Sequence, residues 1–436
     1  MEDFKVVGKV KITGEIILKA PLLIGDGAGE TADNFKDIHV LKNHVGAAFI
    51  PGTSLCGVLR EWLAKNNPAL VEKIFGDTNK MQSSIQLEDI VLAGGEIISR
   101  DGVKIDGVTG TGIDGGKYDY EAIDRGARGD LNLLINLRGC HDETDIKNFV
   151  AKLLRKLEGG IRIGALTSKG FGFTVAENLN AEFFDFRKKA DVIAWLTDKP
   201  AAEKILPAAE KISANAQDFV VDADFVFKSS FIIRDYDTNE KVGESKISAV
   251  SLKSRNDFVI PATSLKGIFR HRAEYIFGKF GLDKNLLDKL LGASIGDEKI
   301  KSRFIVAESY ISPKNIKAIA HTRNKIDRIT GGTLQGTLFS TKPVYGAANL
   351  HVHFEIVDAK DFEAGLAIFL LRDLWLGNVA IGGEKSIGRG TVRGVYAKIN
   401  FRGKSYELDA GGKVISGDKA ELAKFAAAVK NWGDSE

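Results

Sequence analysis

The chain of 436 residues is too long for one ordinary hydrophobic core, so its length indicates two or three domains. Hydrophobic residues make up 44% and charged residues 27%, as in globular proteins, and the net charge of +3 permits an anionic partner without requiring one. Cys56 and Cys140 form no CxxC pair, which excludes a disulfide framework. No apolar run is as long as a membrane span and the acidic N-terminus is not a signal peptide, so we expect a soluble, cytoplasmic protein without membrane contact.

The first half of the chain alternates between strand and helix patterns. Hydrophobic alternation predicts strands within 8–24, and a polar, glycine-punctuated stretch predicts a loop over 26–48. Residues 143–157 have helical periodicity and are followed by Gly159-Gly160, a typical helix C-terminus. The other predicted elements are a helix ending near Lys65, a strand pair in 85–98, a glycine-rich excursion over 101–129, a strand at 131–137 and a glycine-rich turn back to strand within 161–177.

The motif Ile50–Arg60, IPGTSLCGVLR, has the pattern of a strand end followed by a helix start, and it occurs twice. Pro51 ends a strand because it cannot donate to the ladder, and the hydroxyl of Thr53 or Ser54 is expected to cap the helix that follows. At Ile260–Arg270 the sequence is IPATSLKGIFR, with the same apolar positions and the same glycine. A capped amphipathic helix is common, so the repeat has meaning only if other features recur with it.

Other features do recur, in the same order. They are IFG (Ile74–Gly76 and Ile276–Gly278), KID in a glycine-rich context (Lys104–Asp106 and Lys325–Asp327), and a late glycine motif (Gly164, Gly170, Gly172 and Gly382, Gly388, Gly390). This ordered set indicates a duplication. We therefore predict an α+β fold of two tandem ferredoxin-like (RRM-like) domains with long glycine-rich hairpin insertions.

The predicted domain boundaries follow from the duplication. They are a first domain over 1–186, a helical connector over 187–221, a second domain over 222–410 and a C-terminal tail over 411–436. The excursions at 101–129 and 322–349 are the obvious insertions, and excursions of this length are usually functional or disordered.

The late glycine motif is not a nucleotide fingerprint. Gly172 and Gly390 are not followed by Lys-Ser/Thr, and the motif follows a helix and precedes a strand, the reverse of a dinucleotide-binding turn. It is either an ordinary close-packed turn or a backbone surface beside Lys169, Lys385 and Arg389 that binds phosphates. Because these basic features are repeated, they suit a long polyanion better than a small nucleotide.

Taken together, the repeated motifs resemble those of the RAMP superfamily. Within it, the chain looks most like the backbone subunits of type III CRISPR effector complexes, as two fused copies covering roughly 8–185 and 222–400. The resemblance implies that guide RNA, target RNA and the other subunits of the complex are the partners. It also implies that each glycine-rich hairpin acts as a thumb across the guide–target duplex. The implied RNA-binding residues are Ser54, Arg60, Lys104, Lys169, Gly170 and Gly172 in the first copy, and Ser264, Lys266, Arg270, Lys325, Lys385, Gly388, Arg389 and Gly390 in the second.

In cleaving members of this family, an aspartate in the loop before IPG cuts target RNA with a divalent metal ion. The resemblance places that role on Asp37, which would also bind Mg²⁺ or Mn²⁺, with Asp33 and Asp26 as reserves. The plain alternative is a solvated loop aspartate. Counting back from the corresponding strand in the second half leads to Ser248, where no acid stands, so we predict that only the first half cleaves.

Two rival functions stay open at this point. One is a scaffold that binds guide RNA without cleaving. The other is a guide-processing endoribonuclease that uses histidine. His351 and His353 alternate on an evident strand and are expected to be ordinary sheet residues, which disfavours the second rival.

Overall fold

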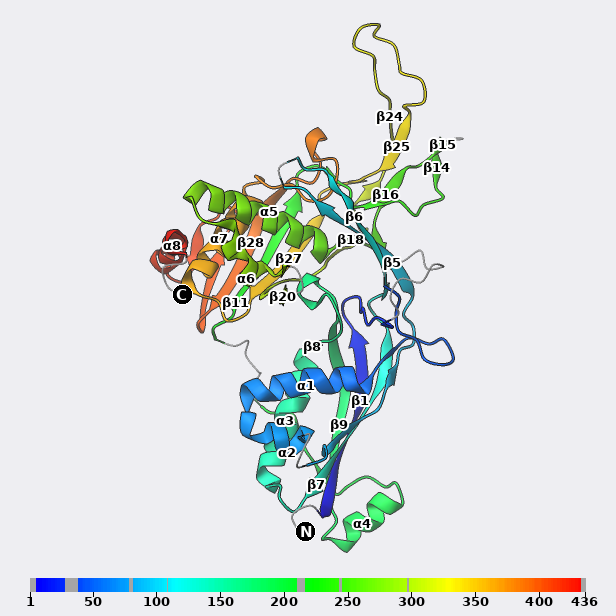
Figure 1. Cartoon of the computed structure of the whole chain (residues 1–436), viewed down its shortest axis with the longest axis vertical. Helices are drawn as coiled ribbons and strands as arrows, with labels where there is room; N and C mark the ends of the chain where they lie inside the picture. Colours follow the sequence, from blue (N-terminus) through cyan, green and yellow to red (C-terminus); the bar gives the residue numbers. More distant parts are fainter. Residues whose placement is uncertain are drawn as a thin grey trace. The chain divides into compact units, whose positions relative to one another are not determined.

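The computed structural model describes residues 5–27, 38–77, 81–107, 109–209, 216–242, 245–295 and 298–432 (Figure 1). The chain divides into two compact units, each with its own hydrophobic core. Unit 1 contains Met1–Thr167 and Phe171–Ser213, and unit 2 contains Ser168–Gly170 and Ala214–Glu436. Among the helices that the structure describes, none combines the length and apolar character that a membrane crossing needs.

Unit 1 is built on an antiparallel sheet with β1 (Val6–Leu18) at its centre. β1 pairs with β7 (Arg128–Arg138) on one side and β9 (Phe173–Asp185) on the other, and β3 (Ile85–Leu87) pairs with the far edge of β7. The strand order β9-β1-β7-β3 therefore interleaves strands from both ends of the unit. The short strands β8 (Ile161–Arg162) and β10 (Glu203–Lys204) extend β9, and β2 (Phe49–Ile50) pairs with β4 (Ile90–Val91).

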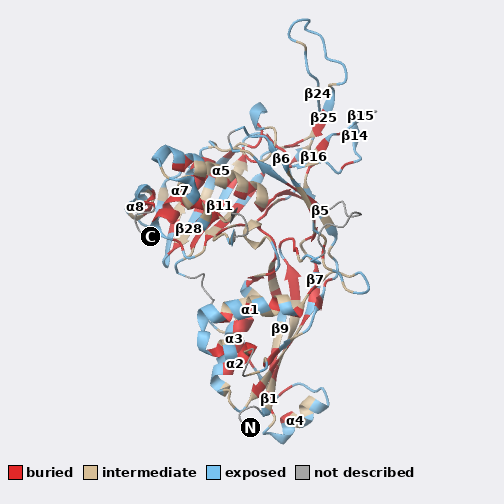
Figure 2. Ribbon diagram, viewed as in Figure 1, coloured by how far each residue is buried: buried red, intermediate tan, exposed pale blue. Residues whose placement is uncertain are grey.

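Three helices of unit 1 share one core with this sheet: α1 (Gly52–Asn66), α2 (Val71–Phe75) and α3 (Glu143–Gly159). A 3₁₀ turn at Pro68–Leu70 lies between α1 and α2, and helix α4 (Lys189–Leu196) supplies none of the described residues of this core. α3 confirms the helix predicted at 143–157: its apolar stripe is buried, Asp142 caps its start, and Gly160 follows its end with φ of +100°. Figure 2 shows the buried residues concentrated between α1, α3 and the sheet.

The predicted hydroxyl cap of α1 is wrong. The helix begins at Gly52, Pro51 is the N-cap residue, and no side chain of the capping residue makes a cap hydrogen bond. Instead the Gly52 N–H donates to Asp89 Oδ1 at 2.8 Å, so a carboxylate distant in the sequence satisfies the first helical amide. The second copy is the same in one respect, because Pro261 is the N-cap of α5 (Ala262–Phe280) and also makes no side-chain cap.

Unit 2 repeats the sheet arrangement with different edges. β11 (Phe219–Phe227) lies between β27 (Asn349–Ile356) and β28 (Val392–Phe401), and β21 (Phe304–Val306) pairs with β27, all antiparallel. β29 (Lys404–Leu408) and β30 (Val414–Ser416) extend the sheet beyond β28. The unit's other helices are α6 (Asp288–Leu291), α7 (Asp361–Trp375) and α8 (Lys419–Ala428), with 3₁₀ turns at Lys284–Leu287, Lys385–Ile387 and Val429–Asn431.

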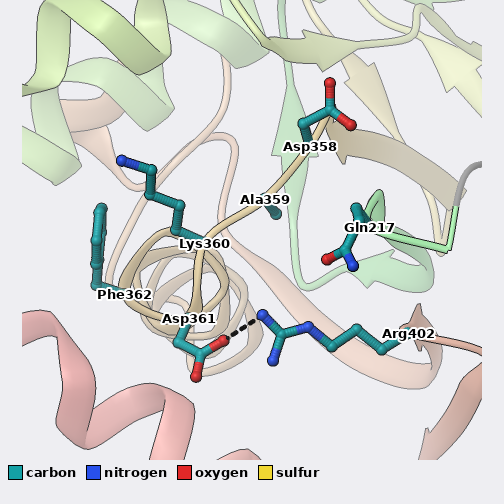
Figure 3. Close-up of a pocket in the computed structure, with 7 residues that line it drawn as sticks. All are labelled: Gln217, Asp358, Ala359, Lys360, Asp361, Phe362 and Arg402. Atoms are coloured by element: carbon teal, nitrogen blue, oxygen red, sulfur yellow. Dashed lines mark ion pairs between the residues drawn. The ribbon is translucent and has the colours of Figure 1, made fainter. Parts of the chain in front are cut away.

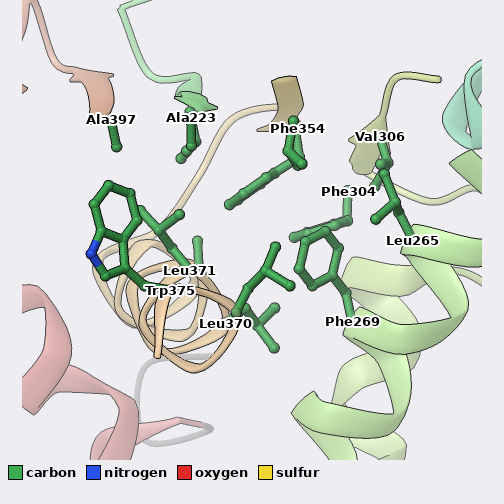
Figure 4. Packing of buried hydrophobic residues seen from close by; sticks show 14 of the residues in the cluster. Ala223, Leu265, Phe269, Phe304, Val306, Phe354, Leu370, Leu371, Trp375 and Ala397 are labelled. Atoms are coloured by element: carbon green, nitrogen blue, oxygen red, sulfur yellow. The ribbon is translucent and has the colours of Figure 1, made fainter. Parts of the chain in front are cut away.

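The core of unit 2 is rich in aromatic rings (Figure 4). Phe304 and Phe354 stack with ring centroids 5.5 Å apart, and Phe269 from α5 meets Phe304 edge-on at 5.8 Å. On β28, Gly394 lies against the Trp375 indole so closely that a Cβ atom there would be 1.9 Å from the ring. Helix α7 is thereby seated on the sheet by a contact that only glycine permits.

Both glycine-rich excursions contain hairpins. In unit 1, β5 (Ile97–Ile105) and β6 (Gly112–Ile123) form a long antiparallel hairpin. In unit 2, β24 (His321–Arg323) pairs with β25 (Phe339–Lys342), and the chain between them continues outward as a long loop (Figure 1). The remaining short strands of unit 2 are β12 (Ser230–Phe231), β13 (Arg234–Asp235), β14 (Lys241–Val242), β15 (Ser245–Lys246), β16 (Ala249–Ser251), β17 (Lys253–Ser254), β18 (Asp257–Ile260), β19 (Ala293–Ile295), β20 (Glu298–Ile300), β22 (Ser309–Ile311), β23 (Lys317–Ala318) and β26 (Val344–Tyr345).

The mixed α+β class predicted from the sequence is confirmed. The interval treated as a connector, 187–221, holds α4, the edge strand β10 and the start of β11, and Ile205 lies in the core of unit 1. The interval treated as a tail, 411–436, supplies β30 and α8, and Trp432 packs against Phe277 and Phe362. The described parts of both intervals therefore contribute to the folded units.

Candidate nucleic-acid interface

The two late glycine motifs fold into the same loop. In unit 1 the Ile163 N–H donates to the Gly172 carbonyl at 3.0 Å, and the Gly172 N–H donates to the Pro21 carbonyl at 2.7 Å. In unit 2 the same bonds join Ile381 to Gly390 at 2.9 Å and Gly390 to Ser230 at 2.8 Å. In each unit the loop therefore ties the segment just after the first strand to the start of the last strand.

Glycine is required at the last position of each loop for two reasons. Gly172 and Gly390 have φ of +74° and +81°, and a Cβ atom there would be 1.8 Å from the Ile163 carbonyl oxygen or 2.0 Å from that of Ile381. The amides of both glycines are already bonded within the chain. These glycines therefore shape the loop, and these two N–H groups do not point to a ligand in this conformation.

The cations around the loops differ in exposure. Lys385 is exposed and Lys169 is half-buried, whereas Arg389 is buried and donates to Glu384 Oε2 at 2.7 Å and to the Tyr345 hydroxyl at 2.8 Å. Gly170 and Gly388 both have φ of +84°. Of the loop cations predicted to meet phosphates, Lys385 is thus directly accessible in unit 2, while Arg389 is held in an ion network that the sequence did not reveal.

The polar residues of the repeated motif differ in exposure between helix α1 of unit 1 and helix α5 of unit 2. Ser54 and Ser264 are both half-buried, and Arg60 on α1 is exposed. In α5, Lys266 is buried and its Nζ donates to Ser302 Oγ at 2.7 Å and to the Phe304 carbonyl at 2.8 Å. Burial lowers the pKa of Lys266 to about 7, so this lysine is a poorer phosphate ligand than the family resemblance implied.

Arg270, also on α5, is half-buried and contacts its own unit. Its guanidinium pairs with Asp288 at 3.4 Å and donates to the Gly292 carbonyl. The first copy of the motif therefore offers a solvent-exposed arginine, whereas in the second copy Arg270 holds α5 against the following turn.

The hairpins carry a repeated tip that sequence reasoning noted only as KID. Asp106 Oδ1 accepts from the Thr109 N–H at 2.7 Å, and Asp327 Oδ1 accepts from the Thr330 N–H at 2.8 Å. In both tips the glycine after the threonine has a positive φ, +70° at Gly110 and +69° at Gly331. Both tips share the sequence K-I-D-x-x-T-G, which forms a turn closed by the hydrogen bond from the threonine N–H to the aspartate side chain. Lys104 and Lys325 stand exposed two residues before each aspartate.

Of the three candidate acids, Asp33 and Asp37 lie outside the described residues, and Asp26 is exposed. The chain resumes at Ile38, which pairs in parallel with Tyr120 of the hairpin strand β6. In unit 2, Ala249 pairs in parallel with Thr341 of the hairpin strand β25. These two pairings are equivalent in the two units, and the residues that precede them in sequence are Asp37 and Ser248.

His351 and His353 are sheet residues, as expected. They lie on β27 and bond across to β11: His351 Nδ1 is 2.8 Å from Asp224 Oδ1, and His353 Nδ1 is 2.8 Å from Asp222 Oδ1. Burial lowers the pKa of His353, but hydrogen bonds to Asp222 and Glu355 outweigh it and raise that pKa to about 9. Both histidines are thus paired with carboxylates of the neighbouring strand.

Two other kinds of site, a metal centre and a pocket, do not add to the predicted RNA-binding residues. Within the described ranges, no group of three or more His, Cys, Asp or Glu side chains is arranged to hold a metal ion. A polar pocket at the start of α7 is lined by Gln217, Asp358, Ala359, Lys360, Asp361, Phe362 and Arg402, with an Asp361–Arg402 ion pair at 2.7 Å (Figure 3). None of its lining residues was predicted to bind RNA.

The fold and these loops define a duplicated α+β protein whose two units repeat one loop, one hairpin tip and one helix motif. The family model of the RAMP superfamily matches residues 15–175 and 224–393, and the chain belongs to this superfamily. The resemblance drawn from the motifs is confirmed at that level, once in each unit. RAMP proteins are generally CRISPR-associated and RNA-binding, typically bind other subunits of CRISPR complexes, and include some that cleave RNA. No curated protein matches the chain.

The loop geometry predicts different costs for two neighbouring substitutions. Gly388→Ala places a side chain at φ of +84° in open space and should lower the free energy of unfolding by about 1–2 kcal/mol. Gly390→Ala has nearly the same φ but also meets the Ile381 carbonyl, so it should cost distinctly more. Urea unfolding measures both; equal losses would contradict the close approach.

The cross-strand histidine predicts a pH dependence of stability. The pKa of His353 is raised in the folded state, so its stabilisation is complete below the unfolded pKa of about 6.5 and is lost as the pH rises toward 9. The difference in unfolding free energy between wild type and His353→Gln should therefore shrink over that range. Lys266 titrates there with the opposite sign, and it cancels in this difference.

The matched control is His351→Gln, which removes the more exposed of the two histidines that pair with Asp222. It should show a smaller pH-dependent difference. A difference for His353→Gln that stays constant from pH 6 to about pH 9 would show that the His353–Asp222 bond does not favour the protonated histidine.

Proposed function

We propose that the chain is a fused backbone subunit of a type III CRISPR ribonucleoprotein, acting in antiviral defence in the cytoplasm. Its two units are ferredoxin-like (RRM-like) domains that both bind guide RNA, and the first also cleaves complementary target RNA. The observation that carries this proposal is the structural duplication of the glycine loop and the hairpin tip. A site that occurs twice in one chain suits a ligand made of repeating units, such as the sugar–phosphate backbone of a nucleic acid.

The strand orders support the ferredoxin-like assignment. Numbering the four main strands of unit 1 along the chain as β1, β3, β7 and β9, their spatial order is fourth, first, third, second, and all neighbours are antiparallel. The strands β11, β21, β27 and β28 of unit 2 repeat that order. Helices follow the first and third strands in both units, as this fold requires.

The exposed cations support guide binding through phosphates. Lys104 and Lys325 lie at matching places on the two hairpins, and Arg60 and Lys385 are also exposed. Ile326 and Ile329, at the second hairpin tip, are 58% and 95% exposed, so this tip combines apolar and basic side chains. Such a tip is suited to a thumb that lies across a duplex, with phosphates bound by lysine and bases met by apolar side chains.

The cleavage proposal rests on Asp37 and its position. The paired residues Ile38 and Ala249 support the equivalence of Asp37 and Ser248, which leaves the acid in the first unit alone. Asp37 would hold a divalent metal ion, Mg²⁺ or Mn²⁺, which supplies positive charge to stabilise the phosphate in the transition state. The carboxylate also suits orientation of the target 2′-hydroxyl toward the neighbouring phosphate.

If phosphate contacts dominate, RNA affinity should depend steeply on salt and weakly on sequence. For an unstructured RNA, each phosphate contact contributes a slope of about −0.7 to log K against log salt, so a slope steeper than about −2 corresponds to three or more contacts. Fluorescence anisotropy with two RNAs of unrelated sequence measures both properties. Salt-independent binding would contradict the proposed surface.

Replacing the proposed catalytic acid should separate cleavage from binding. In a complex assembled with guide RNA, Asp37→Ala should slow cleavage of matched target RNA by about 10²-fold or more and leave target binding unchanged. Asp33→Ala and Asp26→Ala are the controls and should cleave normally. Normal cleavage by Asp37→Ala would overturn the assignment, and loss of cleavage in Asp33→Ala alone would move it there.

A further inference from the structure

Three arginines of unit 2 converge on one carboxylate beside the glycine loop. Arg389 Nε donates to Glu384 Oε2 at 2.7 Å, and the Arg323 guanidinium donates to Glu384 Oε1 at 2.5 Å. The Arg234 guanidinium lies 3.7 Å from the same Oε1. The arginines come from β13, from the hairpin strand β24 and from the loop itself, so three separate segments meet at this point. Arg234, Arg323 and Arg389 are called the arginine triad below.

The triad carries more positive charge than Glu384 neutralises. Three guanidiniums face one carboxylate, and arginine stays protonated in proteins. In addition, Arg323 Nε is buried and, among the described residues, has no hydrogen-bond acceptor. Charge and hydrogen-bonding capacity therefore both exceed what this carboxylate satisfies, which is the state of a site built for an anion with more oxygens.

The triad is held in place by groups other than Glu384. The Arg389 guanidinium also donates to Ser230 Oγ and to the Tyr345 hydroxyl, and the Arg323 guanidinium donates to Thr341 Oγ1 at 3.1 Å. The guanidiniums of Arg389 and Arg323 would therefore stay near their positions if the carboxylate moved away. Side-chain exposure of 41% for Arg234 and 28% for Arg323 leaves the triad reachable from solvent.

Unit 1 shows that the loop itself does not need this ion network. The residue equivalent to Glu384 is Leu166, with φ of +56° against +58°, and the residue equivalent to Arg389 is Phe171. Phe171 is buried in a small apolar cluster with Leu23 and Tyr120, and Leu166 packs against it. Because the same loop closes on apolar contacts, Glu384 and its arginines must be explained by something other than the loop's conformation.

We infer that the arginine triad is an oxyanion site for an RNA backbone phosphate and that the Glu384 carboxylate occupies it in the free protein. On binding, a phosphate takes the bonds from Arg234 and Arg323, and the carboxylate moves to solvent. This inference rests on the proposed RNA-binding function. It adds to that function that Glu384 competes with RNA phosphate for the arginine triad. The competitor lowers the affinity of unit 2 for any isolated phosphate, and several phosphates bound together overcome it.

The test is the effect of removing the negative charge of Glu384. Glu384→Gln keeps the size of the side chain and should bind a fluorescein-labelled, unstructured RNA about tenfold more tightly, with a steeper salt dependence. If the carboxylate were only a structural partner of the arginines, its loss would disorder the site and weaken binding. Unchanged or weaker binding by a folded Glu384→Gln protein would overturn the inference.

Asp373→Asn is the matched control. Asp373 is another buried carboxylate of unit 2 that pairs with two arginines, Arg272 at 2.7 Å and Arg372 at 3.1 Å, but it lies on α7 outside the triad. Its loss should leave RNA affinity unchanged. A similar gain in Asp373→Asn would show that net charge alone explains the effect and would overturn the inference.

Two further measurements cover misfolding and failure of the proposed function. The double variant Glu384→Leu, Arg389→Phe copies the pair found in unit 1, so it should fold. It lacks the competing carboxylate but keeps Arg234 and Arg323, so it should bind RNA at least as tightly as wild type. Weaker binding by this folded variant would contradict the site. Inorganic phosphate should raise the melting temperature of Glu384→Gln more than that of wild type, which tests the anion site without RNA. Absence of RNA binding in every variant would refute the proposed function, whereas equal phosphate responses would refute only the triad.

Discussion

Each unit depends on one close backbone contact, between the last glycine of the loop and the isoleucine at the start of the same loop. Gly172 lies against Ile163 and Gly390 against Ile381, with room for a hydrogen atom but not for a methyl group. The glycine amide donates to the carbonyl of Pro21 or Ser230, just after the first strand, so the first and last strands are linked near this point. The position of every side chain on the loop follows from that closure.

The same closure is filled with different chemistry in the two units. Unit 1 packs Leu166 and Phe171 into an apolar cluster, which does not respond to salt or to anions. Unit 2 places Glu384 and Arg389 at those positions, where in the free protein each charge is stabilised by its pairing with the other. The two copies of the loop have thus diverged: the first is held by apolar packing and the second by ion pairs. The acid expected for cleavage likewise has no counterpart at Ser248.

Local patterns predicted well wherever neighbouring residues decide the structure. The stripe of apolar residues in 143–157 is confirmed as α3, and the alternating His351 and His353 are confirmed as sheet residues. Prediction failed where the partner is distant in the chain. The α1 amide of Gly52 is bonded by Asp89, not by a local hydroxyl, and Lys266, which the family resemblance placed among the RNA-binding residues, is buried. Neither partner can be read from a window of neighbouring residues.

The sequence alone determined that the chain is duplicated, that it belongs to the α+β class and where its special glycines stand, because repeats, periodicity and positive φ are properties of short segments. Tertiary structure alone decided which polar groups are available. Gly390 uses its amide internally, Arg389 is buried, and Arg234 and Arg323 arrive from other segments to surround Glu384. Availability depends on burial and on partners brought together by folding, and these are not encoded in the spacing of any one motif.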